Sequence, residues 1–278
     1  MNKIFTNKDI SEIPKPFIKW AGGKNWLINR IVNFIPQRFN NYHEPFLGGG
    51  AVFFRIRPKN YSFLADLNYE LINVYRQIKK DPESIIKLID TFEISKEKYY
   101  KIRAAKLPDK TYNAARFIYL NKTCYNGIYR VNSRGIFNVP YGHDNSVIIY
   151  DRNNLLAVSK ALKKASLKNQ DFENSLDKIE KHDLIFIDPP YTVAHNNNGF
   201  IEYNQKLFKW EDQERLADYI NKVCKKGAFF ILTNAVHNNI VNLYKNLGKR
   251  FELERHSTIT SHIGKRKKIS EYLFTNCI

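Results

Sequence analysis

The sequence predicts an α/β protein built on a mostly parallel sheet. Short apolar runs with the length of buried strands alternate with amphipathic stretches with the length of helices, and this alternation is typical of a parallel sheet covered by helices. Two of the apolar runs end in a carboxylate, at Asp66 and at Asp188. Ligands of open α/β sheets bind at the carboxyl ends of strands, so both ends are candidate sites.

The N-terminal part contains one predicted helix and two predicted strands. Residues 25–35 (NWLINRIVNFI) repeat apolar groups at helical spacing, and Pro36 ends the pattern. Residues 42–54 (YHEPFLGGGAVFF) begin as a strand, are interrupted by three glycines and continue as a helical pattern. Residues 61–68 (YSFLADLN) form a short strand that ends at Asp66.

The middle of the chain has a different composition. From about Leu71 to Leu120 the pattern is helical and rich in Lys, Arg and Tyr, and residues 151–165 are again helical. Residues 121–145 between them are dense in Asn, Gly, Arg and aromatic residues, which is typical of loops and short hairpins. We therefore predict that this basic stretch is inserted into the sheet domain.

The C-terminal part returns to strands and helices. The apolar run 184–187 (LIFI) leads through DPPY into a polar loop at 192–199. A helix is predicted from about Trp210 to Lys225, and strands at 227–234 and 270–276.

The charge of the chain indicates a polyanionic partner. Its 278 residues include 45 Lys and Arg against 27 Asp and Glu, a formal net charge of +18, which favours nucleic acid as the partner. A solubility effect with lysine-rich bias remains the alternative. The run Lys265–Lys268 is predicted to face phosphate, with a solvated turn as its alternative.

Other features exclude several classes. The three cysteines, Cys124, Cys224 and Cys277, form no CxxC pair and no zinc motif with the histidines. No apolar run approaches the ~20 residues of a membrane span, and the N-terminus lacks a signal-peptide core. We expect a soluble cytoplasmic protein that makes no membrane contact and holds no metal.

The glycine triplet Gly48–Gly50 indicates a ligand loop. It lies between a strand-like and a helical run, where glycine allows close approach of a ligand to the backbone. Asp66 follows 16 residues after Gly50, and an acid about 20 residues past a glycine loop commonly binds ribose hydroxyls. Together they favour a nucleoside-containing cofactor, although the loop is not a GxGxxG motif. A plain turn and a helix N-cap near Asn68 remain open.

The segment Asp188-Pro189-Pro190-Tyr191 has the features of a site for a planar amine. The two prolines keep the chain extended and stop ladder pairing, so the Asp188 carboxylate and the carbonyls of Asp188 and Pro189 are presented as acceptors. The Tyr191 ring adds a stacking face. A flipped adenine would satisfy the acceptors with its amine and the ring with its face. A rigid turn with an ordinary aspartate is the alternative.

Six stretches in order resemble one known family, the Dam-type adenine-N6 DNA methyltransferases of the D12 class, also called the α-arrangement. The stretches are PFIKWAGGK (16–24), EPFLGGGAVFF (44–54), ADLNYELINVY (65–75), CYNGIYRVNSRGIFNVPYG (124–142), DPPY (188–191) and GKRKKISEYLFTN (264–276). They extend over nearly the whole chain, which makes the resemblance far more specific than DPPY alone.

The resemblance implies an S-adenosylmethionine-dependent methyltransferase fold, a mostly parallel seven-stranded sheet with one reversed strand. Residues 1–72 and 146–278 would form the catalytic domain and 73–145 the target-recognition domain. The implied activity is site-specific transfer of a methyl group from S-adenosyl-L-methionine to the N6 amine of adenine in double-stranded DNA, with base flipping. The enzyme would be solitary or belong to a restriction-modification system.

The resemblance also implies site residues, carried over position by position. Asp188, Pro189, Pro190 and Tyr191 would be catalytic. The cofactor would meet Trp20, Lys24, Phe46, Gly48, Gly50, Asp66, Asp171, Phe172 and Asp188. DNA would meet Tyr125, Asn126, Arg130, Asn132, Arg134 and Pro140. Since Arg pairs well with guanine and Asn with adenine, we expect Arg130 to contact a base.

The implied reaction is direct transfer to the adenine amine, without a metal and without a cysteine nucleophile. We expect a monomer, with a cognate restriction endonuclease as a functional partner that forms no stable complex with it. GATC is the first recognition sequence to test, although GHDN (142–145) and the loop 192–200 depart from the Dam type. An RNA adenine methyltransferase and a non-catalytic DNA-binding protein are the alternatives; a nuclease is disfavoured because Asp188 lacks a carboxylate/lysine partner motif.

Overall fold

The computed structural model describes residues 13–105, 107–132, 134–144, 146–192, 208–256 and 268–278. The chain divides into two compact units, each assembled from separate segments. Unit 1 contains Met1–Asn25, Leu47–Lys59 and Asp66–Asn169, and unit 2 contains Trp26–Phe46, Asn60–Ala65 and Gln170–Ile278.

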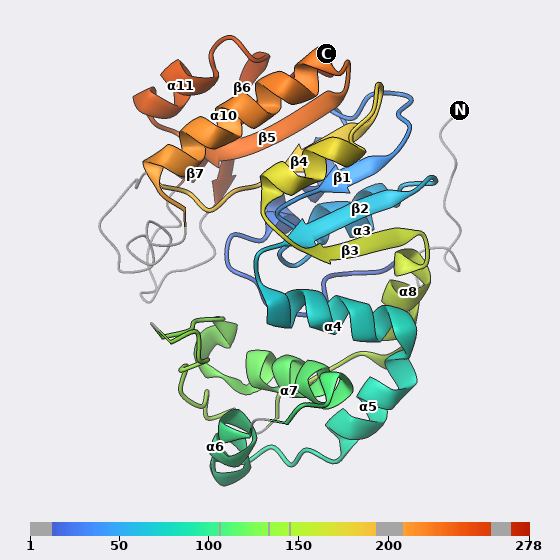
Figure 1. The fold of residues 1–278 in the computed structure, drawn as a ribbon. Coiled ribbons are helices and arrows are strands. Elements are labelled where there is room, and N and C mark those ends of the chain that lie inside the picture. Colours follow the sequence, from blue (N-terminus) through green and yellow to red (C-terminus); the bar gives the residue numbers. More distant parts are fainter. Residues whose placement is uncertain (1–12, 106, 133, 145, 193–207, 257–267) are drawn as a thin grey trace. The chain divides into compact units, whose positions relative to one another are not determined.

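The strands form one seven-stranded sheet in the order β3-β2-β1-β4-β5-β7-β6 (Figure 1). Its strands are β1 (Tyr42–Glu44), β2 (Ser62–Asp66), β3 (Ala165–Asn169), β4 (Leu184–Ile187), β5 (Phe229–Ala235), β6 (Lys249–His256) and β7 (Lys268–Thr275). The pairs β1–β2, β1–β4 and β4–β5 are parallel, whereas β7 is antiparallel to both β5 and β6. The predicted α/β class with one reversed strand is therefore confirmed.

The helices connect these strands. They are η1 (Lys24–Trp26), α2 (Ile28–Ile31), α3 (Ala51–Ile56), α4 (Tyr69–Lys80), α5 (Pro82–Asp90), α6 (Lys96–Ala104), α7 (Lys110–Thr123), η2 (Tyr125–Gly127), α8 (Arg152–Leu162), η3 (Phe172–Lys178), α10 (Trp210–Lys225) and α11 (Asn238–Tyr244). In the part of the chain that is described, no helix has both the length and the apolar character needed to cross a membrane.

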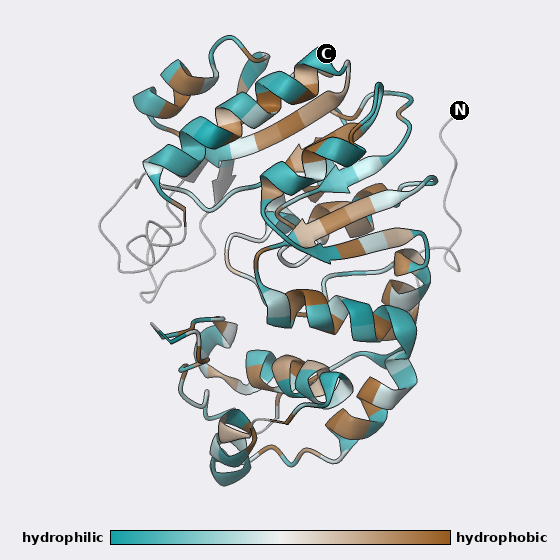
Figure 2. Cartoon of the chain, viewed as in Figure 1, coloured by the Kyte–Doolittle hydropathy of each residue, from teal (hydrophilic) through white to brown (hydrophobic). Residues whose placement is uncertain are grey.

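The core of unit 2 forms where α10 packs on β5. Every residue of β4 is buried, as expected of a parallel strand covered on both faces. The buried positions Leu216, Tyr219, Ile220 and Val223 of α10 recur at helical spacing, and brown and teal segments alternate along this helix in Figure 2. The amphipathic pattern therefore places α10 against the sheet.

Unit 1 holds the helices α4 to α8. The Asn68 side chain accepts a hydrogen bond from the Leu71 N–H and so caps α4. Asp81 caps α5, and Pro82 occupies the first position of that helix, where no N–H is needed. Two isolated antiparallel bridges, Cys124–Tyr141 and Val131–Phe137, follow α7. They confirm the predicted loop and hairpin character after Cys124, whereas residues 121–123 of the predicted range 121–145 belong to α7.

One predicted element was wrong and two strands were not predicted. The helix expected over 25–35 is reduced to η1 and α2, followed by tight turns in which the N–H groups of Asn33 and Phe34 donate to carbonyls three residues earlier. The β-branched and Asn residues there are weak helix formers. The strands β3 and β6 carried no apolar run that predicted them, and both lie at the edges of the sheet.

Candidate active site

The DPPY segment leaves strand β4 directly, because Asp188 follows Ile187 at the end of that strand. Pro189 is buried, whereas Asp188, Pro190 and Tyr191 are half-buried. The segment belongs to no helix or strand, as expected of two prolines that cannot donate to a ladder. The local chemistry therefore ends the strand and places a carboxylate at its end.

Two side chains from other strands hold the two ends of this segment. The Thr233 hydroxyl, on β5, donates to Oδ1 of Asp188 at 2.7 Å. The Tyr191 hydroxyl donates to Oε2 of Glu271, on β7, at 2.6 Å. Thr233 and Glu271 are only 1% and 3% exposed, so these two partners are shielded from water, whereas Asp188 and Tyr191 are half-buried.

A buried polar network continues from the next residue. The Thr192 hydroxyl accepts from Nε2 of Gln213 at 3.0 Å and donates to the Phe208 carbonyl at 3.2 Å. Oε1 of Gln213 in turn accepts from Asn234 and from the Tyr244 hydroxyl, at 3.1 and 2.8 Å. Buried polar groups must find such partners, and these tie the segment after DPPY to α10, β5 and α11.

An aromatic cluster in unit 2 contains two of the predicted cofactor residues. The rings of Phe46 and Phe172 are stacked, with centroids 5.4 Å apart. Phe172 is 2% exposed because Phe208 and Tyr219 also pack on it. Phe46 is half-buried, so it offers more surface to a ligand than Phe172.

Arg215 contacts this cluster and three carboxylates beside it. Its guanidinium lies over the Phe172 ring, 5.0 Å from the centroid, and donates to Oδ1 of Asp171 at 2.9 Å. It also contacts Glu173 and Asp212, and its hydrogen bond to Glu173 is the main reason that the pKa of Arg215 is raised. The predicted cofactor residue Asp171 is thus held by a side chain that the sequence did not single out.

The glycine loop of unit 1 lets other groups come close to its backbone. Gly48 and Gly50 have φ angles of +48° and +67°, in the left-handed region that favours glycine. A Cβ atom on Gly48 would lie 2.8 Å from Cδ1 of Trp20. The Tyr75 hydroxyl donates to the Gly48 carbonyl at 3.0 Å. The loop therefore packs on Trp20 in a way that a side chain at position 48 would prevent.

Asp66 is bound to the same loop. Its Oδ2 accepts from the Gly48 N–H at 3.0 Å, and its Oδ1 accepts from the Asn68 N–H at 2.9 Å. Burial raises the pKa of the Asp66 carboxyl, and these two hydrogen bonds only partly oppose that rise. The alternative that Asp66 is an N-cap is wrong, because Asn68 caps α4.

Lys24, the last predicted cofactor residue of unit 1, is 4% exposed. Its ammonium donates to the Gly22 carbonyl at 3.1 Å. A buried ammonium needs acceptors around it, and this contact places the Lys24 head group against the AGGK turn.

Comparison with known protein families identifies the family of the chain. Residues 20–261 match the family of D12 class N6 adenine-specific DNA methyltransferases. The chain belongs to this family. This D12 methyltransferase is thus an adenine-specific DNA methyltransferase, and its substrate is DNA.

Relatives of the methyltransferase match it along most of its length. It is 36% identical to the type II methyltransferase M1.LlaDCHI of Lactococcus lactis subsp. cremoris, over 94% of this chain and 95% of that protein. It is 37% identical to the type II methyltransferase M.MjaIII of Methanocaldococcus jannaschii, over 87% and 90%. The DNA adenine methylase of Vibrio cholerae is 29% identical, over 93% and 95%.

D12 methyltransferases use S-adenosylmethionine, and the glycine loop of this methyltransferase fits that cofactor. Asp66 is half-buried and each of its oxygens accepts one N–H. A carboxylate oxygen can accept a second hydrogen bond, so the pair has capacity for two ribose hydroxyls. A Cβ atom at Gly48 would clash with the Trp20 side chain, so glycine at this position lets the loop pack on Trp20.

The segment 124–142 of the methyltransferase, termed the recognition segment, exposes all six predicted DNA contacts. They are Tyr125, Asn126, Arg130, Asn132, Arg134 and Pro140. Oδ1 of Asn132 accepts from the N–H groups of Arg134 and Ile136, at 3.0 and 3.1 Å, so this oxygen shapes the tip of the hairpin. Nε of Arg130 donates to Oδ1 of Asn138 at 3.0 Å.

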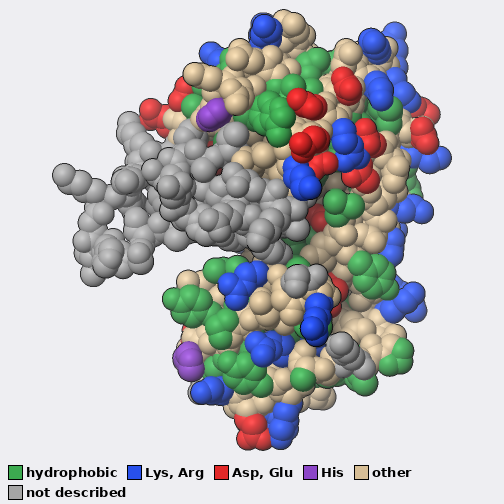
Figure 3. Space-filling view, turned by 60° about the vertical axis from the view of Figure 1, so that its left-hand side comes forward, with side chains coloured by type: hydrophobic (Ala, Val, Ile, Leu, Met, Phe, Trp, Pro, Cys, Tyr) green, Lys and Arg blue, Asp and Glu red, His purple; other side chains and the backbone are tan. Residues whose placement is uncertain are grey.

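The basic charge of the methyltransferase is dispersed over the face drawn in Figure 3. Lys and Arg side chains lie there among acidic, hydrophobic and uncharged groups. The predicted basic run Lys265–Lys268 and the polar loop 192–200 fall almost entirely outside the described residues.

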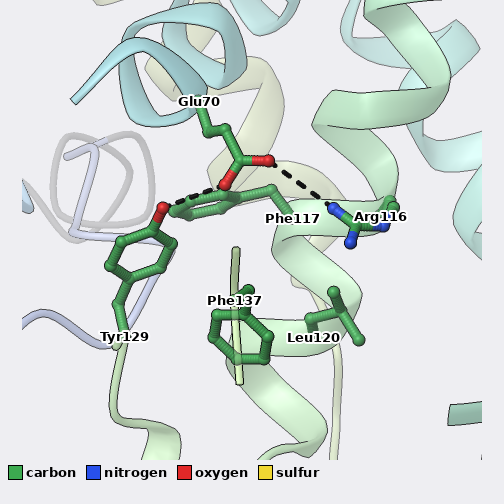
Figure 4. A pocket seen from close by; sticks show the side chains of 6 residues that line it. All are labelled: Glu70, Arg116, Phe117, Leu120, Tyr129 and Phe137. Atoms are coloured by element: carbon green, nitrogen blue, oxygen red, sulfur yellow. Dashed lines mark hydrogen bonds and ion pairs between the residues drawn. The ribbon is translucent and has the colours of Figure 1, made fainter. Parts of the chain in front are cut away.

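A stack of three aromatic rings connects Trp20 to the recognition segment within unit 1. Tyr129 stacks on Trp20 and on Phe117, with centroid distances of 5.3 and 5.1 Å. The Tyr129 hydroxyl donates to Oε2 of Glu70 at 2.9 Å, and Nη1 of Arg116 lies 3.6 Å from Oε1 of Glu70. Figure 4 shows Glu70 between these two partners in a small pocket. Sequence reasoning missed this group because Tyr129 was one aromatic residue among many.

Cys124, His43 and His237 have contacts that point to structural roles. Burial raises the pKa of the Cys124 thiol to about 11, which disfavours a thiolate nucleophile at neutral pH. His43 pairs with Asp183, and the ring of His237 caps α11. His195 lies outside the described residues. Among the residues that are described, no three His, Cys, Asp or Glu side chains form a metal-binding group.

Proposed function

We propose that this methyltransferase acts on an adenine flipped out of duplex DNA and that the DPPY segment holds the flipped base. The observation that carries the proposal is the Asp188 carboxylate, which lies at the end of β4 and is fixed there by the Thr233 hydroxyl. A positioned acceptor of this kind suits an amine that must be aligned before it reacts.

Each member of the segment has a separate role in this proposal. The Asp188 carboxylate and the Pro189 carbonyl accept hydrogen bonds from the adenine amine and favour a tetrahedral nitrogen. The Tyr191 ring stacks on the base. Pro190 keeps the chain extended, so that these groups stay in one orientation. Positioning and electrostatics then supply most of the acceleration.

S-adenosylmethionine supplies the activated methyl group as a sulfonium. We propose that Asp66 binds its ribose hydroxyls and that Gly48 and Gly50 allow the backbone to approach it. Trp20 and Lys24 bind the methionine end. The remaining proposed contacts come from unit 2 and are Phe46, Asp171, Phe172 and Asp188.

We propose residues 1–72 and 146–278 as the catalytic domain and 73–145 as the target-recognition domain. The exposure of the predicted DNA contacts on the recognition segment supports this division. Arg130 and Arg134 are the proposed base and phosphate contacts, because guanidinium groups serve both purposes. The net charge of +18 supports attraction to a nucleic acid in general.

We further propose a role in restriction and modification, because two relatives named type II methyltransferases match over 90% or more of their own length. The cognate endonuclease would share the DNA site without a stable complex, and the methyltransferase would act as a monomer. GATC is the first sequence to test.

The test is methyl transfer from S-adenosylmethionine to unmethylated duplex DNA, with nucleosides separated by mass and modified positions mapped. We expect N6-methyladenine at one short motif and no transfer by Asp188→Ala, which should still bind DNA. Transfer to RNA alone, or an Asp188→Ala variant with most of its activity, would overturn the proposal.

A further inference from the structure

Thr233 and Glu271 each form a hydrogen bond with one end of the DPPY segment. Thr233 lies on β5 and Glu271 on β7, which are antiparallel neighbours in the sheet. Thr233 is 45 residues from Asp188 along the chain, and Glu271 is 80 residues from Tyr191. The two ends of one short segment are thus held by two adjacent strands.

The Thr233 hydroxyl fixes the plane of the Asp188 carboxylate. The carboxylate of an aspartate rotates easily about its Cβ–Cγ bond, because the energy minimum of this torsion is broad. The 2.7 Å hydrogen bond to Oδ1 removes that freedom and thereby orients the other oxygen as well. Hydrogen bonds to an ionised acceptor are stronger than neutral ones, and Thr233 is buried.

The Glu271 carboxylate fixes the ring of Tyr191. A tyrosine ring can turn about two side-chain bonds, and a hydrogen bond at the hydroxyl holds the far end of the ring in place, which restrains rotation about the Cα–Cβ bond. The 2.6 Å separation of the Tyr191 hydroxyl from Oε2 is in the range of charge-assisted O–H···O⁻ bonds. A buried carboxylate is costly unless it is hydrogen-bonded, and the Tyr191 hydroxyl is one donor that Glu271 has.

We infer that Thr233 and Glu271 are positioning residues for methyl transfer: Thr233 sets the orientation of the Asp188 carboxylate, and Glu271 sets the orientation of the Tyr191 ring. This inference rests on the proposed role of DPPY. Neither residue touches the base; each acts through a member of the segment. Loss of either contact slows the chemical step and leaves the binding of cofactor and DNA largely intact.

Thr233→Val tests the first half, because it removes the hydroxyl and keeps the shape. We expect kcat to fall about 10-fold to 100-fold, as misplacement of a reacting group does, with KM for DNA and Kd for S-adenosylmethionine within about threefold of wild type. Thr233→Ser should restore most of kcat. If the valine variant does not fold, Thr233→Cys replaces it, since a thiol is a weak donor.

Thr275→Val is the matched control. The Thr275 hydroxyl is also buried in the sheet and donates to the Phe230 carbonyl at 2.6 Å, but it does not contact the DPPY segment. We expect this variant to lose stability and to keep its kcat. A Thr233→Val enzyme with kcat near wild type, or a kcat loss in Thr275→Val as large as that in Thr233→Val, would overturn the inference.

A double-mutant cycle tests the second half. Tyr191→Phe and Glu271→Gln each remove or weaken the same hydrogen bond from opposite sides, and the Phe ring can still stack. If Glu271 acts through Tyr191, both single variants lower kcat and the double variant is no worse than the poorer single one. Effects that multiply in the double variant would show that Glu271 does not act through the ring.

Asp188→Ala separates failure of this inference from failure of the proposed function. If Asp188→Ala abolishes transfer while the Thr233 and Glu271 variants match wild type, only the positioning inference fails. If Asp188→Ala remains active, the role of DPPY itself fails, and the inference fails with it.

Discussion

The imidazole of His43 and the carboxylate of Asp183 form a fully buried pair, with Nε2 and Oδ2 2.8 Å apart. Asp183 immediately precedes β4, and His43 lies in β1, its parallel neighbour. The two oxygens of Asp183 also accept the N–H groups of Asn41 and Glu180. One carboxylate therefore ties together the beginnings of two central strands.

Replacing Asp183 should destabilise the fold. Asp183→Ala leaves the His43 ring and two N–H groups without their acceptor in a buried site, where each unsatisfied buried group costs about 1 to 3 kcal/mol. Urea unfolding at pH 7 measures the change. A loss below about 1 kcal/mol would contradict the expectation.

The same carboxylate should make stability depend on pH. Burial alone would raise the pKa of the Asp183 carboxyl, but the hydrogen bonds from His43, Asn41 and Glu180 outweigh it and lower that pKa. A lowered folded-state pKa stabilises the protein above the unfolded value of about 3.9, and the contribution is lost as pH falls through the folded value. Urea unfolding at several pH values below 5 should show a shallower pH dependence for Asp183→Asn than for wild type.

Gly48→Ala should weaken cofactor binding as well as stability. Its φ of +48° and the 2.8 Å approach of a Cβ atom to Trp20 would force the loop to move. Gly135→Ala is the control, since φ there is +71° but nothing lies within 4 Å of the Cβ position. We expect Gly135→Ala to lose about 1 kcal/mol from backbone strain alone, and Gly48→Ala to lose more and to bind S-adenosylmethionine at least about tenfold less tightly. Calorimetric titration measures the affinity for S-adenosylmethionine, and thermal unfolding measures the stability. Equal affinity and equal stability of the two variants would refute the steric argument.

Arg215→Gln should affect the cofactor more than the fold. Arg215 is 40% exposed, and ion pairs so open to solvent contribute about 1 kcal/mol or less. In Arg215→Gln, the guanidinium that contacts both Asp171 and the ring of Phe172 is missing, so neither side chain is held by it. Affinity for S-adenosylmethionine should therefore fall about fivefold. Arg152→Gln removes an exposed ion pair with Glu83 and should leave that affinity unchanged. An unchanged affinity in Arg215→Gln would show that the cluster has no part in cofactor binding.

Asn132→Ala should relax sequence discrimination by loosening the hairpin tip. Its amide oxygen holds the N–H groups of Arg134 and Ile136. Asn132→Ser keeps a side-chain oxygen that can form the same kind of turn but has no amide to pair with adenine. If the turn is what matters, Ser retains discrimination and Ala loses it, in methylation assays on single-base variants of the mapped site. If both lose it equally, the amide itself contacts a base.

The sequence predicted the centre of the sheet far better than its edges. Strands β4 and β5 and helix α10 were predicted because burial on both faces, or on one helical stripe, leaves an apolar pattern. The missed strands, Ala165–Asn169 and Lys249–His256, are the two edge strands, and edge strands carry charged residues that obscure the strand pattern.

The candidate site was also only partly predictable from the sequence. Gly48, Asp66 and Asp188 could be selected as candidate site residues because each lies next to a strand end; their roles remain predictions. Thr233, Glu271 and Arg215 could not be predicted, because their partners lie 45, 80 and 44 residues away and meet only in the folded sheet. A carboxylate inside the strand SEYLF was the one available signal, since a buried charge in a strand requires a partner.

The position of β7 has a consequence for synthesis of the chain. It is the last of the seven strands in sequence, yet it lies between β5 and β6, which leave the ribosome earlier. Until Lys268–Thr275 emerge, β6 has no neighbour through which to join the sheet, and Tyr191 has no Glu271 to bind. A nascent chain can therefore form the parallel half of the sheet before the hydrogen bond between Tyr191 and Glu271 exists, and this hydrogen bond becomes available only when the last strand has been made.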